Sequence, residues 1–197
     1  MRLSWVENRV FSSRTYLLEE PGEPAWLVDC GCWERLLAQT GREVALQGVL
    51  LTHAHYDHIY GLPALLKRWP DCRIYTNAAG VEALASPRGN MSRYHEDPIS
   101  ITGENIVVVR EGVRIPLFSG VEAEVFETPG HHPSCMIFRV GECFFTGDAY
   151  IPGEKVVTTL PGGDKALAAA SLARILKMTE GRDLYAGHEP RKTKDTI

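Results

Sequence analysis

Short apolar runs alternate with longer segments of helical periodicity along most of this chain. In the first half, the pattern predicts strands at residues 15–18, 25–28, 45–52 and 73–76, and helices at residues 33–40, 62–69 and 78–85. Val49-Leu50-Leu51 is a continuous apolar run, which is typical of a strand buried on both faces.

The second half loosely repeats this order. It predicts strands at residues 106–109, 121–127, 135–140, 142–145 and 183–186. The clearest helix covers residues 164–178, with Asp164 as its N-cap. Strands mixed with helices in two similar halves indicate sheets packed centrally with helices outside, in an α/β or α+β fold.

One stretch, residues 86–105, breaks the periodicity and is rich in proline and glycine. It predicts a long loop, and an ordinary surface loop is a simpler interpretation than a segment that contacts substrate. No repeat, low-complexity stretch or Ser/Gly-rich linker divides the sequence. The 197 residues are therefore expected to form one domain, 1–197.

Composition and charge narrow the class of protein. The chain has 21 Lys and Arg against 25 Asp and Glu, a net charge of −4, which argues against a basic nucleic-acid binder or a polybasic membrane protein. No apolar run approaches the ~20 residues that span a bilayer, and residues 1–20 lack the order of a secretory signal. The five cysteines form no C-x-x-C pair, so we expect reduced thiols and a cytoplasmic protein. The basic run at 191–194 is expected to be solvated.

The residues that can carry chemistry begin with one dense motif, Thr52-His53-Ala54-His55-Tyr56-Asp57-His58. His53 and His55 are two positions apart, so in extended backbone both rings point the same way. Asp57 and His58 come where the chain turns and can aim at a different point. One short loop can thus serve two neighbouring metal ions, which in two-metal hydrolases lie ~3.5–4 Å apart. A polar turn without any ligand is the alternative interpretation.

Three further motifs place a ligand-type residue after a predicted strand and a glycine: Gly130-His131, Gly147-Asp148 and Gly187-His188. Together, the motifs hold five of the seven histidines, a concentration that argues against purely structural roles. Imidazoles combined with carboxylates suit Zn²⁺, Mn²⁺ or Fe. His132, beside His131, is either a polar contact at the rim of the site or merely a neighbour.

With its motifs in this order, from Val28-Asp29 through His188, the chain resembles the metallo-β-lactamase-fold metallohydrolases. The resemblance implies an α+β fold: a four-layer αββα sandwich of two mixed β-sheets flanked by helices. It also implies two divalent metal ions, zinc first, with iron or manganese as alternatives. The first ion would be held by His53, His55 and His131, the second by Asp57, His58 and His188, and Asp148 would bridge both. Asp29 would orient ligands by hydrogen bonds.

Within this superfamily, Asn90-Met91-Ser92 and Leu160-Pro161-Gly162-Gly163-Asp164 look most like small bacterial glyoxalase II-like proteins. That resemblance implies cleavage of a thioester or related ester of a small molecule by a metal-bound hydroxide, with Asp57 and Asp148 as the catalytic carboxylates. A mononuclear iron persulfide dioxygenase and a phosphodiesterase or RNase Z-like nuclease stay open, although the acidic charge argues against nucleic acid as a partner. Asp148 stands where classical zinc β-lactamases carry Cys or Ser, which argues against antibiotic hydrolysis. The substrate-contacting residues and the oligomeric state stay open.

Overall fold

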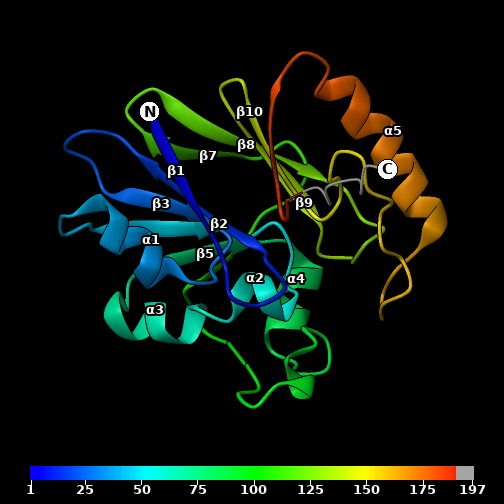
Figure 1. The fold of residues 1–197 in the computed structure, drawn as a ribbon, viewed down its shortest axis with the longest axis horizontal. Helices are drawn as coiled ribbons and strands as arrows, with labels where there is room; N and C mark the ends of the chain where they lie inside the picture. The colour runs from blue at the N-terminus through cyan, green and yellow to red at the C-terminus, as the bar shows by residue number, and fades with distance from the viewer. Residues whose placement is uncertain (190–197) are drawn as a thin grey trace, which may run out of the picture.

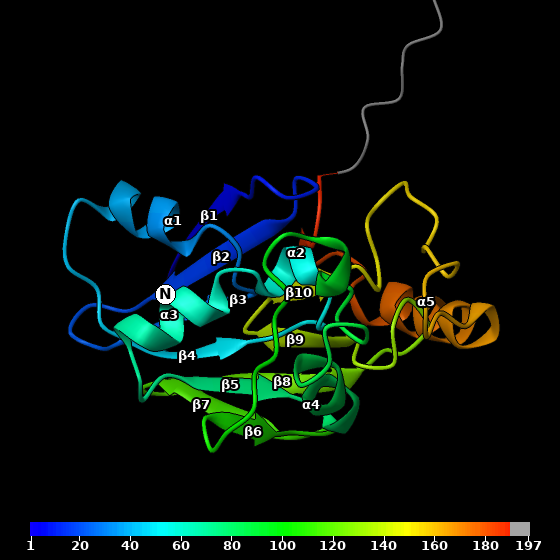
Figure 2. The ribbon, with the colours of Figure 1, turned by 90° about the horizontal axis from the view of Figure 1, so that it is seen from below.

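Two mixed β-sheets pack face to face in the computed structural model, which describes residues 1–189 (Figure 1 and Figure 2). The first sheet has the spatial order β1 (Arg2–Glu7), β2 (Arg14–Glu19), β3 (Ala25–Val28), β4 (Leu46–Leu50), β5 (Arg73–Thr76), β6 (Ile106–Val108). The second has the order β11 (Asp183–Ala186), β10 (Cys143–Gly147), β9 (Met136–Val140), β8 (Val121–Glu127), β7 (Arg114–Phe118). The helices are α1 (Trp33–Thr40), α2 (Tyr56–Ile59), α3 (Leu62–Arg68), α4 (Ala78–Leu84) and α5 (Lys165–Met178).

The alternation of side chains along the strands builds three apolar layers. In β4, Val49 packs into a core between the first sheet and its helices, whereas its neighbour Leu50 faces the core between the two sheets. In β9, Phe138 joins the inter-sheet core, and Ile137 packs with Ile175 of α5 on the opposite face. The layers therefore run helix, sheet, sheet, helix, which confirms the expected αββα sandwich.

Most predicted elements are present, and their ends differ from the prediction by at most two residues. Asp164 precedes α5 and accepts hydrogen bonds from the backbone N–H groups of Ala166 and Leu167, at 2.8 and 2.9 Å. It is the N-cap that the sequence predicted, because it satisfies two donors that the helix itself leaves free.

The pattern of apolar residues missed β1, β7 and the short helix α2. In β1 only Val6 is buried, so the strand shows no alternation of apolar and polar residues. β7 contains Pro116, which normally argues against a strand, but β7 lies at the edge of its sheet, where the missing N–H is tolerated. Segment 86–105 is irregular as predicted, apart from one 3₁₀ turn, Ser92–Tyr94.

The loops that follow β4, β8, β10 and β11 meet at one edge of the two sheets. The backbone N–H of Met136 donates to the carbonyl of Thr52 at 2.8 Å, and Ser13 forms a β-bridge with His188. Both contacts join the first sheet to the second. Within residues 1–189, no helix is both long and apolar enough to cross a membrane. The basic run at 191–194 lies outside the described residues.

Candidate metal centre

The loop after β4 arranges its four ligand-type side chains in two directions, as the sequence predicted. His53 and His55 lie on the extended segment before α2, with ring centroids 4.8 Å apart. Asp57 and His58 lie within α2, where the chain turns. All four side chains are buried, which is unusual for such polar groups unless they bind something or one another.

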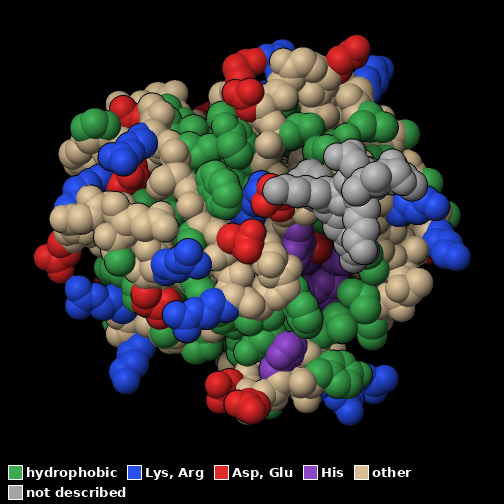
Figure 3. Space-filling view, viewed as in Figure 1, with side chains coloured by type: hydrophobic (Ala, Val, Ile, Leu, Met, Phe, Trp, Pro, Cys, Tyr) green, Lys and Arg blue, Asp and Glu red, His purple; other side chains and the backbone are tan. Residues whose placement is uncertain are grey.

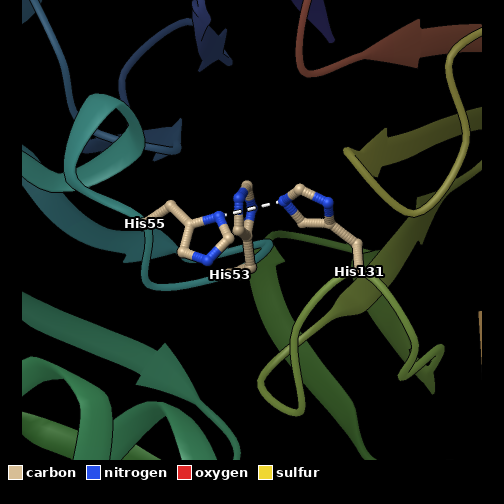
Figure 4. A group of neighbouring side chains, drawn as sticks. All are labelled: His53, His55 and His131. Atoms are coloured by element: carbon tan, nitrogen blue, oxygen red, sulfur yellow. Dashed lines mark hydrogen bonds between the residues drawn. The ribbon is translucent and has the colours of Figure 1, made fainter. Parts of the chain in front are cut away.

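Three imidazoles form the first group. His53 and His55 meet His131, which reaches in from the loop after β8, and the ligand atoms of the three lie within 4.8 Å of one another (Figure 4). His131 Nε2 is 2.9 Å from His55 Nδ1. Among the described residues, the Nε2 atoms of His53 and His55 have no hydrogen-bond partner, although both are buried. A buried nitrogen without a partner is costly, so Nε2 of His53 fits a role as a metal donor, whereas His55 presents Nδ1, the nitrogen that faces His131.

A second group combines Asp57, His58 and His188. His188 Nε2 lies 3.2 Å from Asp57 Oδ2, and His58 Nε2 lies 3.4 Å from the same oxygen. Two donor atoms bound to one ion at about 2.0–2.1 Å with tetrahedral angles lie about 3.3 Å apart. The spacing of the second group therefore matches that of ligands on a single ion.

Asp148 lies between the two groups. Its Oδ2 is 3.6 Å from His131 Nε2 and 3.4 Å from His188 Nε2, while its Oδ1 is 3.4 Å from His58 Nε2. One carboxylate thus contacts a member of the first group and two members of the second. This donor set, with imidazoles and carboxylates only, fits a pair of divalent ions.

Asp29 touches the cluster from behind. Its Oδ2 accepts a hydrogen bond from His58 Nδ1 at 2.7 Å and another from the Thr52 hydroxyl at 2.8 Å, and its Oδ1 accepts from the Thr52 N–H at 2.8 Å. Because Nδ1 of His58 donates to this carboxylate, Nε2 is left to face Asp57 and Asp148. Asp29 therefore orients His58, as expected from the sequence.

Backbone carbonyls orient two more rings in the same way. His131 Nδ1 donates to the carbonyl of Val157 at 2.8 Å, and His188 Nδ1 donates to the carbonyl of Phe11 at 3.0 Å. Each bond leaves Nε2 directed at Asp148, which is the orientation a metal ligand needs.

The electrostatics of the two groups differ. Burial and the neighbouring imidazoles lower the pKa of His53 well below its usual value, and they lower the pKa of His55 to about 3. Burial also opposes the charge of His188, but hydrogen bonds to Asp148 and Asp57 raise its pKa to about 9. His53 and His55 are therefore neutral near pH 7, whereas His188 holds a proton between the two carboxylates.

A glycine permits the closest approach in the cluster. A Cβ placed on Gly187 would lie 2.2 Å from Asp148 Oδ1 and 2.9 Å from His58 Cε1, so no larger residue fits without displacing them. The glycines that precede His131 and Asp148 are equally crowded, by Ala168 and Thr52. The requirement for glycine that the sequence suggested has this steric origin.

His132 lies beside the cluster rather than in it. Its Nδ1 contacts the N–H and hydroxyl of Ser134, at 3.1 and 2.7 Å, and its ring centroid is 4.9 Å from that of His55. The five cysteines are free thiols, and burial raises the pKa of Cys30 and Cys135, the two nearest to site motifs.

A cavity of about 510 Å³ opens onto the cluster. Most of the residues that form its wall were not predicted from the sequence to belong to the site. Its lining includes side chains from the loop between β1 and β2, from segment 86–105 and from the segment before α5: Phe11, Met91, Tyr94, His95, Val157 and Leu160. Only the long loop was noted in the sequence, as a segment that contacts substrate in some proteins. Phe11 carries no signal in the sequence.

Comparison with known proteins agrees with this geometry. The family model described as the metallo-beta-lactamase superfamily matches residues 8–188. The chain belongs to the metallo-β-lactamase superfamily. This confirms the resemblance drawn from the motifs, and it places the chain among metal-dependent hydrolases.

Three similar proteins illustrate the range of the superfamily. The solved B3 metallo-β-lactamase BLEG-1 has a TM-score of 0.84 and 26% identity over 96% of this chain and 92% of its own. The solved structure of TTHA1623, in a di-iron-bound form, has a TM-score of 0.78 and 28% identity over 95% and 92%. A hydroxyacylglutathione hydrolase of Parasynechococcus marenigrum is 38% identical over 75% of this chain, but the match spans only 54% of that enzyme.

Proposed function

We propose that this chain is a dinuclear metal-dependent hydrolase that cleaves a thioester or a related ester. One observation carries the proposal: Asp148 lies within 3.6 Å of donor atoms from both groups of side chains. In the proposed site, His53, His55 and His131 hold one ion, and Asp57, His58 and His188 hold the other. Asp148 would serve as a ligand to both ions. Zinc is the proposed metal, with iron as the alternative because a similar protein binds a pair of iron ions.

A bound pair of divalent ions would supply an activated water and polarise a carbonyl oxygen. The chain's own residues prepare the site for that chemistry. Asp29 and the carbonyls of Val157 and Phe11 fix the ring orientations of His58, His131 and His188. The two site carboxylates, Asp57 and Asp148, are ionised, because the nearby His58 and His188 hold their pKa values low despite burial.

Asp57 has a second proposed role, as a group that accepts and passes a proton. It lines the cavity, so its carboxylate is accessible to a bound substrate. A thiolate leaves without protonation by a strong acid, so thioester cleavage does not require a further acid beside the cluster.

The named relatives support the proposal that this chain cleaves a thioester, but the activity itself has to be measured. The hydroxyacylglutathione hydrolase is similar over little more than half of its own length, and BLEG-1 is a β-lactamase of similar fold. The first experiment therefore measures metal content by elemental analysis on protein purified without added metal. Activity is then assayed on a panel: neutral thioesters, S-lactoylglutathione, a chromogenic cephalosporin, a phosphodiester and a persulfide with an oxygen electrode.

About two equivalents of metal and thioester turnover that disappears in the Asp148→Ala variant would support the proposal. About one equivalent of iron with oxygen uptake would replace it with the persulfide dioxygenase. Turnover of the phosphodiester or the cephalosporin alone would replace it with a nuclease-type or lactamase activity. Full thioester turnover in the Asp148→Ala variant would refute the role of the bridging carboxylate.

A further inference from the structure

Apolar side chains that a protein normally buries stand exposed around the mouth of the cavity described above. Phe11 is 70% exposed, Tyr94 67% and Val157 49%, and all three line this cavity together with Met91 and Leu160. Figure 3 shows hydrophobic side chains around the histidines on this face of the molecule. Exposed apolar residues that gather at one concave site, next to a reactive centre, indicate a bound apolar group.

Two of the residues that line the cavity have a strained backbone conformation. Phe11 and Met91 have φ values of +51° and +66°, in the left-handed region that residues other than glycine rarely adopt. Such conformations persist where the surrounding structure enforces them, and they concentrate at binding sites. The carbonyl of Phe11 is the group that accepts from His188, so the same turn both lines the cavity and orients a member of the cluster.

Hydrogen bonds and ring stacking hold the long loop 86–105 in a defined conformation. Asn90 and Ser92 are fully buried, and they hydrogen-bond to the carbonyl and the N–H of Ile99 at 2.9 and 2.7 Å. His95 stacks on Tyr56, with ring centroids 3.8 Å apart and an angle of 16° between the planes. The loop is thereby fixed against the helix that follows His55, so its contribution to the cavity wall is a constant part of the structure.

The charge around the cavity disfavours an anionic occupant. Among the described residues, neither Lys nor Arg lines it. On the loop, the acidic Glu96 and Asp97 lie near Tyr56 of the cavity wall, and the guanidinium of Arg93, which is outside the lining, lies over the ring of Tyr94 at 5.2 Å from its centroid. Lys155 lines an adjoining cavity of about 460 Å³, which shares Phe11, Asp148, Val157 and His188 with the first. A substrate spanning the cluster therefore has an apolar side and a polar side.

We propose that the cavity lined by Phe11, Met91, Tyr94 and Leu160 binds an uncharged apolar or aromatic group on one side of the scissile bond. The inference rests on the proposed hydrolase function and narrows its substrate class. Glutathione carries two carboxylates, so a glutathione thioester fits this cavity poorly, and S-lactoylglutathione is a weak substrate.

The test uses two series of thioesters with the metal-loaded protein. One series varies the acyl group on N-acetylcysteamine, from acetyl through butanoyl and hexanoyl to phenylacetyl; the other keeps acetyl and varies the thiol. Each longer member has a partner that ends in a carboxylate. In one of the two series, kcat/KM rises about fourfold per buried methylene, and the carboxylate partner loses at least tenfold. Absence of a rise in both series, or preference for the carboxylates, overturns the inference.

A variant that introduces a positive charge locates the effect. Leu160→Lys, in the cavity wall, is expected to narrow or invert the ratio between each neutral substrate and its carboxylate partner. Val108→Lys is the control, because Val108 is apolar like Leu160 but lies exposed in β6, outside the cavity lining. Equal ratios in the Leu160→Lys variant and its control overturn the assignment.

Binding of non-hydrolysable thioethers separates this inference from the proposed function. S-hexyl-N-acetylcysteamine and its carboxylate partner are compared by calorimetry on the metal-loaded protein. If the neutral thioether binds at least tenfold tighter while no thioester is cleaved, the cavity assignment stands and the hydrolase proposal fails. If thioesters are cleaved but the two thioethers bind equally, the hydrolase stands and the cavity assignment fails.

Discussion

Replacement of Asp29 by Asn removes one negative charge from behind the cluster and leaves the shape almost unchanged. In the structure the Asp29 carboxylate accepts three hydrogen bonds, two from Thr52 and one from His58 Nδ1. An amide offers one acceptor oxygen and an NH₂ donor in their place. If the NH₂ group faces His58, two donors oppose each other, and the ring is driven to carry its proton on Nε2. That nitrogen is the one that faces Asp57 and Asp148.

The expected loss follows from these contacts. Removing a partner that orients a metal-binding histidine typically costs 10–100-fold in affinity, or about 1.4–2.7 kcal/mol. The metal-free fold is expected to lose about 2 kcal/mol, because one buried, charge-assisted hydrogen bond is removed. For a chain of this size, that lowers Tm by about 4–8 °C. Asp29 has a φ of +58°, which Asn tolerates, so backbone strain does not add to the effect.

The assay is a competition titration of metal against a chromogenic chelator, with thermal unfolding of the chelator-treated protein followed by circular dichroism. Asp71→Asn is the matched control, because Asp71 is exposed in the turn before β5. We expect one ion to bind as in the parent protein and the ion at Asp57, His58 and His188 to bind 10–100-fold more weakly. Unchanged affinity for both ions in the Asp29→Asn variant would show that the carboxylate does not orient the ligand.

Three further predictions follow from other contacts. Gly187→Ala places a methyl group 2.2 Å from Asp148 Oδ1, so the folded variant is expected to bind fewer than two metal equivalents by elemental analysis; two equivalents would contradict the steric argument. Asp164→Ala removes the N-cap of α5 and is expected to cost about 1 kcal/mol, or about 2–4 °C in Tm, with metal content unchanged. An unchanged Tm would show that the cap contributes nothing. The pKa of His188 is about 9 and that of His55 about 3, so at pH 7.5 His188 releases a proton on binding metal and His55 does not. Calorimetry in buffers of different ionisation enthalpy measures the release, and the absence of proton release when the ion at Asp57, His58 and His188 binds would refute the assignment.

The sequence predicted the layers of the fold better than the edges of its sheets. Buried strands such as β4 can be recognised in the sequence by continuous apolar runs, because both of their faces pack against other apolar side chains. Two of the four edge strands within residues 1–189 lack that signal: β1 buries only Val6, and β7 carries Pro116. What makes these segments strands is pairing with β2 and β8, which is a tertiary interaction.

The candidate site was likewise predictable only in part. The spacing within the motif from His53 to His58 predicted which side chains could share an ion, because local backbone geometry sets their directions. The cavity wall was not predictable, since Phe11 and Tyr94 come from separate loops and carry no chemistry of their own. Only the packing of those loops at the edge of the sheets makes them neighbours.

The distances within the cluster depend on the core between the sheets. Four of its members lie on the loop after β4, and the other three follow strands of the second sheet. Tyr16 ties the two sheets together, because its hydroxyl donates at 2.5 Å to the carbonyl of Ala186, two residues before His188. A close-packed core does not deform continuously, so it holds the donor atoms at a fixed spacing. The loops at the rim contact the cluster through the backbone carbonyls of Phe11 and Val157, so their side chains can vary without removing those hydrogen bonds. Under the proposed function, the sandwich would set the chemistry of the reaction, and residues such as Phe11, Tyr94 and Leu160 would set the choice of substrate.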